Sequence, residues 1–368
     1  MSPHSELEYQ IALTLLPGIG PTAARRILSN FKSASAFFHE KPEKLIKQFR
    51  VTPQVLQAMK NAEMWRDAER EVRFLNDNGY RAIFYTDENY PTRMRNCEDA
   101  PVLIYTHGET KLNNQKVLAI VGTRNATPQG KEICDKIIEY LKDYRLLIVS
   151  GLAFGIDTQA HQSALDHGLP TAAVMGTGLD SIYPYKNKRL AEHIAAHGML
   201  ISEFRNGTKP DRENFPQRNR IVAGMSDAIL VVEAAERGGA LITAEIALSY
   251  NRDVLAVPGR PTDHYSRGCN YLIRNNKAAL VQSGEDIEYL LGWEKKAEDK
   301  QRTQTMLFAD LNEEESALAT ILREKGKIAL DELMLVSEKP LSKLVTLLLE
   351  MELKGIVRAL PGKQYELI

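Results

Sequence analysis

Short apolar runs alternate with longer amphipathic stretches through the middle of the chain. The runs occupy residues 116–121, 146–150, 171–175, 199–201, 228–232 and 254–257, with a weaker one at 278–281. Most of the segments between them are long enough for a crossover helix. Near-continuous apolar strands joined by helices are typical of a parallel sheet covered on both faces. The pattern predicts an α/β fold with an extended, doubly wound, Rossmann-like sheet.

The sections on either side of this sheet show helical patterns. Before residue 85, apolar residues recur at helical spacing, as in Leu7, Ile11 and Leu15. Pro17-Gly18-Ile19-Gly20 ends that first helix, and Pro21 can begin the next one. After residue 310, three short helical patterns precede two strand-like segments, which is the order of a winged helix.

A charged stretch, residues 294–305, separates the sheet from the last section and has few apolar residues, as linkers do. The chain is therefore predicted to contain a helical domain at 1–85, a Rossmann-like domain at 86–292, a linker at 293–310 and a winged helix at 311–368.

Composition narrows the class of protein. The 368 residues are 43% hydrophobic and 26% charged, which indicates a globular protein and not a disordered one. No apolar run approaches the roughly 20 residues needed to span a bilayer, so no membrane association is expected. The first nine residues carry no apolar signal segment, and the three cysteines are too scattered for a disulfide framework or zinc knuckle. We expect a cytoplasmic protein. Its net charge of −1 means that any basic surface must be local.

Ligands of open parallel sheets bind beyond the carboxyl ends of the strands, so the residues after each run are the candidates. Gly122-Thr123-Arg124 could clamp a phosphate through backbone, hydroxyl and guanidinium, or could be a tight turn with a surface arginine. The segment 150–157 lacks the GxGxxG spacing, but its small residues Gly151 and Gly155 could still cradle an anion. Asp157 is predicted to be a helix N-cap; with His161 it lacks a third metal ligand.

Basic and aromatic residues gather after the later runs. Tyr183 and Tyr185 stand beside Lys186, Lys188 and Arg189, a mixture that suits a single nucleic-acid strand but also a solvated helix start. The segment 206–220 has a net charge of +2, from four Lys and Arg residues against two Asp and Glu residues. Phe215 lies within it, and its ring either packs into the hydrophobic core or offers a surface on which a base can stack.

The segment 233–245 follows the fifth run. Gly238 and Gly239 form a phosphate-sized turn there, before a predicted helix. Asp227 and Glu233 could act as acids or bases, but no nucleophile–base pair, Walker lysine motif or metal-ligand set accompanies them. This favours a binding protein, with no enzymatic activity and no cofactor.

Five motifs in order resemble the DNA-processing protein A family, also called Smf. They are Val121-Gly122-Thr123-Arg124, the segment 150–157, the segment 176–180 with Tyr183-Pro184, the segment 213–221 and Val257-Pro258-Gly259. Tyr90-Pro91 and the segment 101–105 also look like that family. The resemblance covers residues 85 to 290.

The resemblance implies a homodimer that binds and protects single-stranded DNA, loads the recombinase RecA during natural transformation, and has no established catalysis. It implies that Arg124 clamps a phosphate, that Lys186 contacts DNA, and that Arg212 and Phe215 contribute a charge and a stacking ring. The predicted DNA-binding residues are Gly122, Thr123, Arg124, Gly151, Phe154, Gly155, Lys186, Lys188, Arg212, Phe215, Arg218, Asn219, Arg220, Gly238 and Gly239.

The sequence departs from the family pattern in three places. Gly238-Gly239-Ala240 stands where relatives often have Ser-Gly-Ser, which removes hydroxyl groups that could contact phosphate. Pro258-Gly259-Arg260 stands where Pro-Gly-Asn is usual, and Asn275-Asn276-Lys277 replaces a Gly-Ala element. The last two changes affect a loop and the region near the dimer surface of relatives.

The flanking sections have weaker signals. Residues 16–28 resemble a helix-hairpin-helix, in which Gly18, Gly20, Arg25 and Arg26 would hold phosphates; packing alone is the alternative. Residues 305–368 hold 8 Lys and Arg against 11 Asp and Glu, a net charge of −3, which favours protein contact over DNA binding there.

Two other functions stay open on the same fold. The segment 238–245 loosely resembles the Pro-Gly-Gly-x-Gly-Thr-x-x-Glu loop of Lonely-Guy nucleotide phosphoribohydrolases, although Leu241 and Ile242 stand where Gly and Thr should be. A small-nucleotide sensor is the third possibility, since the glycine-lined cleft could hold a mononucleotide.

Overall fold

The computed structural model of this chain describes residues 4–113, 116–293, 311–337, 339–354, 356–360 and 364–367. The chain divides into two units between Lys295 and Lys296. Apart from Trp293, the predicted linker at 293–310 lies outside the described residues. The finer division of the first unit stays a prediction.

Six helices form the N-terminal part of the first unit. They are α1 (Glu6–Leu15), α2 (Pro21–Leu28), α3 (Ala34–Phe38), α4 (Pro42–Phe49), α5 (Pro53–Met59) and α6 (Ala62–Asn78). Ser5 and Glu8 make a capping box that begins α1, and Pro21 begins α2 as predicted. Gly18, at φ +74°, makes the turn between the two helices.

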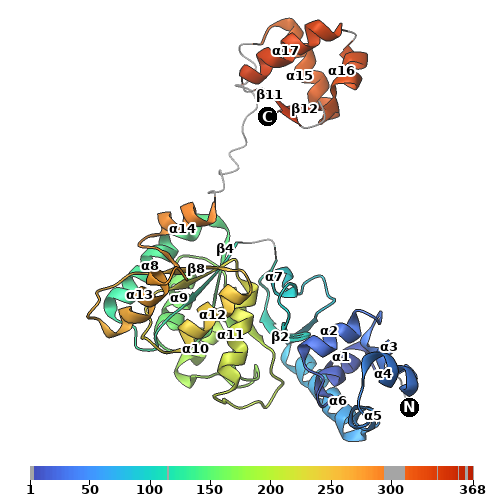
Figure 1. Cartoon of the computed structure of the whole chain (residues 1–368), viewed down its shortest axis with the longest axis vertical. Helices are drawn as coiled ribbons and strands as arrows, with labels where there is room; N and C mark the ends of the chain where they lie inside the picture. Colours follow the sequence, from blue (N-terminus) through green and yellow to red (C-terminus); the bar gives the residue numbers. More distant parts are fainter. Residues whose placement is uncertain are drawn as a thin grey trace. The chain divides into compact units, whose positions relative to one another are not determined.

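A nine-stranded sheet crosses the first unit in the order β1-β2-β6-β5-β4-β3-β7-β8-β9 (Figure 1). The strands are β1 (Arg81–Phe84), β2 (Leu103–Gly108), β3 (Lys116–Val121), β4 (Leu146–Ser150), β5 (Thr171–Val174), β6 (Met199–Ser202), β7 (Ala228–Val231), β8 (Asp253–Ala256) and β9 (Ala279–Leu280). The seven strands β3 to β9 are parallel to one another. β1 pairs antiparallel with β2, and β2 pairs antiparallel with β6. The predicted doubly wound sheet is confirmed, and each of its seven predicted strands is present. The strands β1 and β2 were not predicted.

Helices cover both faces of the sheet because the central parallel strands are largely apolar and buried on both sides. They are α7 (Thr92–Arg95), α8 (Pro128–Leu141), α9 (Ile156–Asp166), α10 (Lys188–His197), α11 (Asn214–Met225), α12 (Gly239–Ser249), α13 (Arg267–Arg274) and α14 (Gly284–Leu291), with short 3₁₀ turns η1 (Lys142–Tyr144), η2 (Tyr185–Asn187) and η3 (His264–Ser266).

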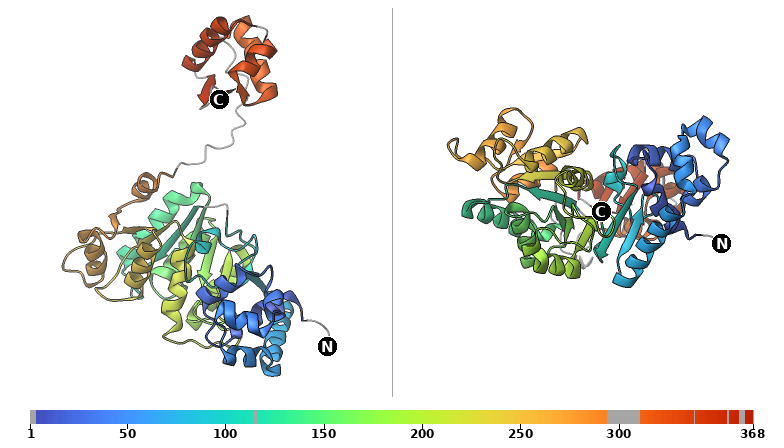
Figure 2. Two further views of the ribbon diagram at one scale, coloured as in Figure 1. Left: turned by 45° about the vertical axis from the view of Figure 1, so that its right-hand side comes forward. Right: turned by 90° about the horizontal axis from the view of Figure 1, so that it is seen from below.

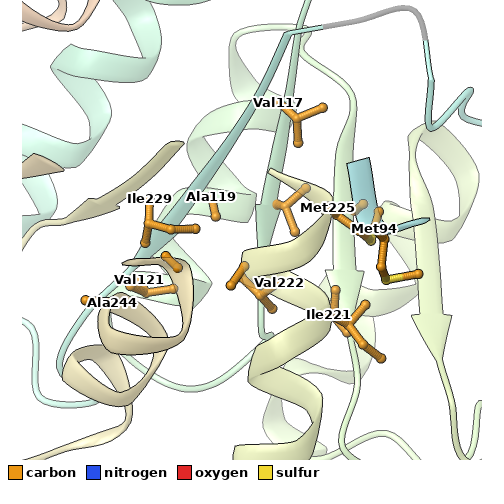
Figure 3. Close-up of a cluster of buried hydrophobic side chains, with 14 of the residues drawn as sticks. Met94, Val117, Ala119, Val121, Ile221, Val222, Met225, Ile229 and Ala244 are labelled. Atoms are coloured by element: carbon orange, nitrogen blue, oxygen red, sulfur yellow. The ribbon is translucent and has the colours of Figure 1, made fainter. Parts of the chain in front are cut away.

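Alternate residues of β3 show how the two faces are filled. Val117, Ala119 and Val121 share a buried cluster with α11 and α12, and Figure 3 shows them beside Val222 and Ala244 of those helices. The residues between them, Leu118 and Ile120, pack with α8 and α9 on the opposite face. A third cluster joins the N-terminal helices to β2 and α10, and those helices lie together at the β2 end of the sheet (Figures 1 and 2).

The second unit has the elements of a winged helix. Its helices are α15 (Glu313–Lys325), α16 (Leu330–Ser337) and α17 (Leu341–Leu353), and its strands β10 (Ile328–Ala329), β11 (Val357–Leu360) and β12 (Gln364–Leu367) form a sheet in the order β10-β12-β11. The predicted helix order and the final hairpin are confirmed. Residues 361–363, between β11 and β12, lie outside the described residues.

Candidate nucleic-acid interface

The strand order places a crevice between β3 and β7. From β3 the chain builds β4, β5 and β6 to one side, and then crosses back to build β7, β8 and β9 on the other. The helices that follow β3 and β7 therefore cover opposite faces of the sheet, although these two strands are adjacent. Ligands of doubly wound sheets bind at such a switch point.

The loops after β3, β4 and β7 pack against one another through their backbones. Thr123 N donates to Glu233 O at 2.7 Å, and Ile156 N donates to Thr123 O at 3.2 Å. A Cβ on Gly122 or Gly155 would overlap this backbone, so both positions need glycine. The glycines predicted to cradle a ligand therefore also bring the three loops together.

Glu233 occupies the N-terminus of the first crossover helix, α8. Its carboxylate accepts from Thr127 N at 2.9 Å and from Thr127 Oγ1 at 2.5 Å. A Rossmann nucleotide phosphate uses this kind of helix end, but here a carboxylate of the chain already satisfies it. Asp227, the other predicted acid or base, accepts from Arg93 Nε at 2.5 Å and from Val117 N at 2.8 Å. Both carboxylates therefore hold structure together.

An aromatic and cationic cluster lies over the carboxyl ends of β3 and β5. The half-buried ring of Phe215 lies against Gly176, where an added Cβ would be 3.2 Å from Phe215 Cδ1. The Arg124 guanidinium is 5.5 Å from the centroid of that ring, and the ring of Tyr183 is 5.6 Å from it. Arg124 is exposed and its side chain makes no hydrogen bond or ion pair with any described residue. A free cation beside two accessible rings can hold a phosphate and stack a base.

Arg218 lies buried beneath the loop that follows β4. It is 5% exposed, its Nε has no hydrogen-bond partner among the described residues, and a Cβ on Gly151 would overlap its guanidinium. Burial lowers the pKa of Arg218, while the charge of Asp157 opposes that shift. Asp157 is itself buried, which raises its pKa, and the charge of Arg218 opposes that shift in turn. The loop thus rests on a buried cation.

The prediction that Asp157 is the N-cap of α9 is wrong. Gly155 is the N-cap residue, and Asp157 Oδ2 accepts from Ala153 N at 3.3 Å, so its carboxylate stabilises the preceding loop. His161, one turn later, places Nδ1 2.7 Å from Thr171 Oγ1, and burial lowers its pKa to about 3. Across the described ranges, no three His, Cys, Asp or Glu side chains gather in a way that could hold a metal ion.

The remaining predicted cations fall into two groups. Lys186 and Arg212 are exposed, and their side chains make no hydrogen bond or ion pair with any described residue. Lys188 is also exposed, 4.0 Å from Glu192 and 6.0 Å from the centroid of the Tyr185 ring. Arg220, in contrast, pairs with Glu203 and donates to Asp99 O, so its charge is used inside the fold.

The glycine turn after β7 borders the same interface. Asn219 Nδ2 is 3.5 Å from Gly239 O, which ties α11 to the start of α12. Gly238 and Gly239 are exposed, and a Cβ on Gly238 would meet nothing within 4 Å. Phe154, on the β4 loop, is 42% exposed. These residues leave room for a ligand over the loops.

The N-terminal hairpin presents less free charge than its sequence indicates. Arg25 donates to Tyr85 Oη at 3.0 Å, to Arg95 O at 2.7 Å and to Cys97 O. Arg26 donates to Phe49 O at 3.3 Å. Gly18 and Gly20 are exposed. A phosphate held here would compete with these contacts, and DNA binding by the hairpin stays a prediction.

Sequence reasoning placed Tyr183 in a motif but not among the binding residues, and it did not single out Gly176 as the residue beneath Phe215. The signal for Tyr183 was an aromatic residue inside a lysine-rich segment. No local signal marks Gly176, because its neighbour Phe215 is distant in the sequence.

Comparisons with known proteins identify the relatives of this chain. The family model of DNA recombination-mediator protein A matches residues 81–292, and that of the DprA winged helix domain matches residues 303–363. The DNA processing protein DprA of Streptococcus pneumoniae is 45% identical over 201 residues, which are 55% of this chain and 71% of that protein. Protein Smf of Synechocystis is 32% identical over 411 aligned residues, and the match covers 99% of both chains.

Solved structures of two relatives are similar to this one. The X-ray structure of DNA processing protein A from Streptococcus pneumoniae has a TM-score of 0.65 and 34% identity, and covers 78% of this chain and 98% of that one. A structure of the Helicobacter pylori protein, described in terms of its single-stranded DNA binding mode, has a TM-score of 0.53 and 28% identity, with 58% of this chain and 97% of that one covered. Within the described residues, no helix has the length and apolar character to cross a bilayer.

Proposed function

We propose, since this chain belongs to the DNA recombination-mediator protein A family, that it binds single-stranded DNA across the carboxyl ends of β3, β4 and β5. The observation that carries the proposal is the cluster of Phe215, Tyr183 and the free Arg124 guanidinium. A base stacks on the Phe215 ring while Arg124 holds a neighbouring phosphate. The exposed cations Lys186 and Arg212 extend the positive surface along the strand.

A paired duplex fits this cluster poorly. The bases of a duplex are stacked on each other, so stacking on Phe215 would require unpairing, which costs free energy. A single strand offers its base faces without that cost. We therefore infer a preference for single strands that does not depend on base sequence.

The experiment is fluorescence anisotropy of a labelled dT oligonucleotide at several salt concentrations, with unlabelled duplex as competitor. Arg124→Ala should weaken binding and reduce the slope of log K against log salt by about 0.7, the value for one phosphate of a single strand. Phe215→Ala should cost about 1–3 kcal/mol of binding free energy with little change in that slope.

Tyr289→Ala is the matched aromatic control, because Tyr289 on α14 is 86% exposed and lies outside the cluster. It should bind as the wild type does. Binding by Arg124→Ala and Phe215→Ala at wild-type strength would refute this location, and no binding by the wild type at low salt would refute the function itself.

We extend the proposal to recombination: a cytoplasmic homodimer that protects single strands and loads RecA onto them. Support for the dimer comes from Tyr271 and Leu280, which are 40% and 47% exposed on α13 and on the edge strand β9. An apolar edge of this kind gains stability when a second copy covers it. RecA loading is tested by strand exchange on a single strand already coated with single-strand-binding protein, with Arg124→Ala as the variant that should lose the stimulation.

The geometry gives less support to a phosphoribohydrolase. The glutamate that would complete its motif is Glu245, whose carboxylate is 2.6 Å from Lys277 Nζ. Incubation with AMP, followed by assay for released adenine, should give no product above the background without protein.

A further inference from the structure

A cavity of about 920 Å³ lies beyond the carboxyl ends of β7 and β8. Its walls are the start of α8, the residues that follow β7 and β8, and the turn η3. We propose that this cavity is a second nucleotide subsite, in which a single strand that passes Arg124 places a base, while Arg260 holds the adjacent phosphate. This inference rests on the proposed function and assigns residues that the first cluster does not include.

The inner wall of the cavity suits a flat, partly apolar base. Ile133, Val232 and Val257 supply apolar surface, and the half-buried Tyr265 supplies a ring. Polar groups stand among them, as in most pockets that orient a small ligand through a few hydrogen bonds. The cavity volume is in the range of pockets that hold drug-sized ligands, so one nucleotide fits with room for solvent.

Arg260 lies on the wall of this cavity, and its side chain holds no other described residue in place. It is exposed, and its guanidinium makes no hydrogen bond or ion pair with any of them. A cation that the fold does not use is available to an anionic ligand.

Asn125, the residue after Arg124, connects the first cluster to a residue that lines the cavity. Asn125 Nδ2 donates to Tyr265 Oη at 3.0 Å. The strands β3, β7 and β8 are neighbours in the sheet, so the carboxyl ends of β3 and β8 are about 10 Å apart, or two strand spacings. A single DNA strand held by Arg124 therefore needs to extend only about 10 Å to reach Tyr265. This proximity favours a DNA strand over an unrelated small ligand.

Two carboxylates border the cavity, and they differ in availability. Glu233 is engaged with Thr127, as described above. Asp263 is exposed, and its side chain has no partner among the described residues. A carboxylate accepts hydrogen bonds from the exocyclic amino groups of cytosine or adenine, and thymine has no such group. The subsite should therefore favour an amino-bearing base over thymine.

The first test compares the wild type with Arg260→Ala on short and long oligonucleotides. An oligonucleotide of about four residues, the lower limit of single-strand site sizes, fills the Arg124 cluster alone and should bind both proteins equally. One of about 15 residues should bind Arg260→Ala several-fold more weakly, with a salt slope reduced by about 0.7. Lys142→Ala is the charge control, because Lys142 lies in η1, before the amino end of β4. It should match the wild type on both lengths.

The second test is photo-cross-linking with 5-iododeoxyuridine placed at each position of the long oligonucleotide in turn. Cross-links to Phe215 and to Tyr265 should come from different positions of the same strand. One cytosine introduced into a thymidine oligonucleotide should strengthen binding at the position that cross-links to Tyr265, and Asp263→Ala should abolish that gain.

The two proposals fail in different ways. If the wild type binds the long oligonucleotide but Arg260→Ala binds it equally and Tyr265 is never cross-linked, the second subsite is refuted and the first cluster stands. If the wild type binds no oligonucleotide of either length, both are refuted.

Discussion

Replacing Arg218 with methionine should destabilise the first unit and make the loss depend on pH. Arg218 is 5% exposed, and Asp157 is the carboxyl group whose charge opposes its desolvation. Removing one partner of a buried charge pair costs about 3–5 kcal/mol, because the other charge stays buried without compensation. The Nε of Arg218 has no hydrogen-bond partner, so its removal breaks no bond there, and we expect the lower end, about 3 kcal/mol near neutral pH.

The pH dependence follows from the shift of Asp157. Burial raises the pKa of Asp157 in the folded protein, and the charge of Arg218 opposes that rise. Without Arg218 the folded pKa rises further above the unfolded value of about 3.9. A raised carboxyl pKa stabilises the fold below the unfolded pKa, and that stabilisation is lost as the pH rises through the folded pKa. The difference in free energy of unfolding between the wild type and Arg218→Met should therefore grow with pH. It should grow by about 1.4 kcal/mol per pH unit between the wild-type pKa of Asp157 and its pKa in the variant.

Urea unfolding followed by tryptophan fluorescence measures this difference, because both tryptophans of the chain, Trp65 and Trp293, lie in the first unit. Arg212→Met is the matched control: Arg212 is exposed, so its loss should stay within about 0.5 kcal/mol at every pH. If Arg218→Met loses the same free energy of unfolding near pH 5 and near pH 7.5, Asp157 is not the group that compensates Arg218.

Three further outcomes are expected. Glu233→Gln should cost about 1.5–3 kcal/mol in urea unfolding, because it weakens charge-assisted bonds from Thr127, and a double-mutant cycle with Thr127→Ala should show coupling between the two. Leu280→Glu should shift sedimentation from dimer to monomer; an unchanged dimer would exclude β9 from the interface. Lys354→Met should destabilise the second unit at neutral pH, because its ammonium lowers the pKa of the buried Glu315 carboxyl group at 2.7 Å. Since a lowered pKa stabilises the fold fully above the unfolded value of about 4.3, that loss should shrink as the pH falls below this value and disappear below the folded pKa of Glu315, as followed by thermal unfolding.

The parallel part of the sheet could be predicted because its strands are buried on both faces. β3 and β4 are apolar apart from Lys116 at the start of one and Ser150 at the end of the other, and the predicted limits of both strands are confirmed residue for residue. The edge strand β1 gave no such signal. Only Phe84 of its four residues is buried, and its antiparallel pairing with β2 depends on a partner about 20 residues away. A short strand at a sheet edge is defined by that pairing more than by its own side chains.

Sequence also singled out most of the candidate interface, since the carboxyl ends of parallel strands lie at one edge of the sheet. It could not separate free cations from engaged ones. Arg124, in the loop after β3, and Arg220, within α11, carry the same charge, yet Arg220 pairs with Glu203 while Arg124 lies free over Phe215. The Arg25 guanidinium likewise donates hydrogen bonds to acceptors more than 50 residues away in the sequence.

The sequence by itself thus determined the parallel strands, their order along the chain and the loops that carry the interface, because burial on two faces imposes a local apolar pattern. Tertiary structure alone decided which side chains meet. Glu233 caps α8 where a nucleotide phosphate could otherwise bind, and Phe215 lies against Gly176 beneath Arg124. Those contacts join residues from separate crossovers of the sheet, and no local pattern records the distance between them.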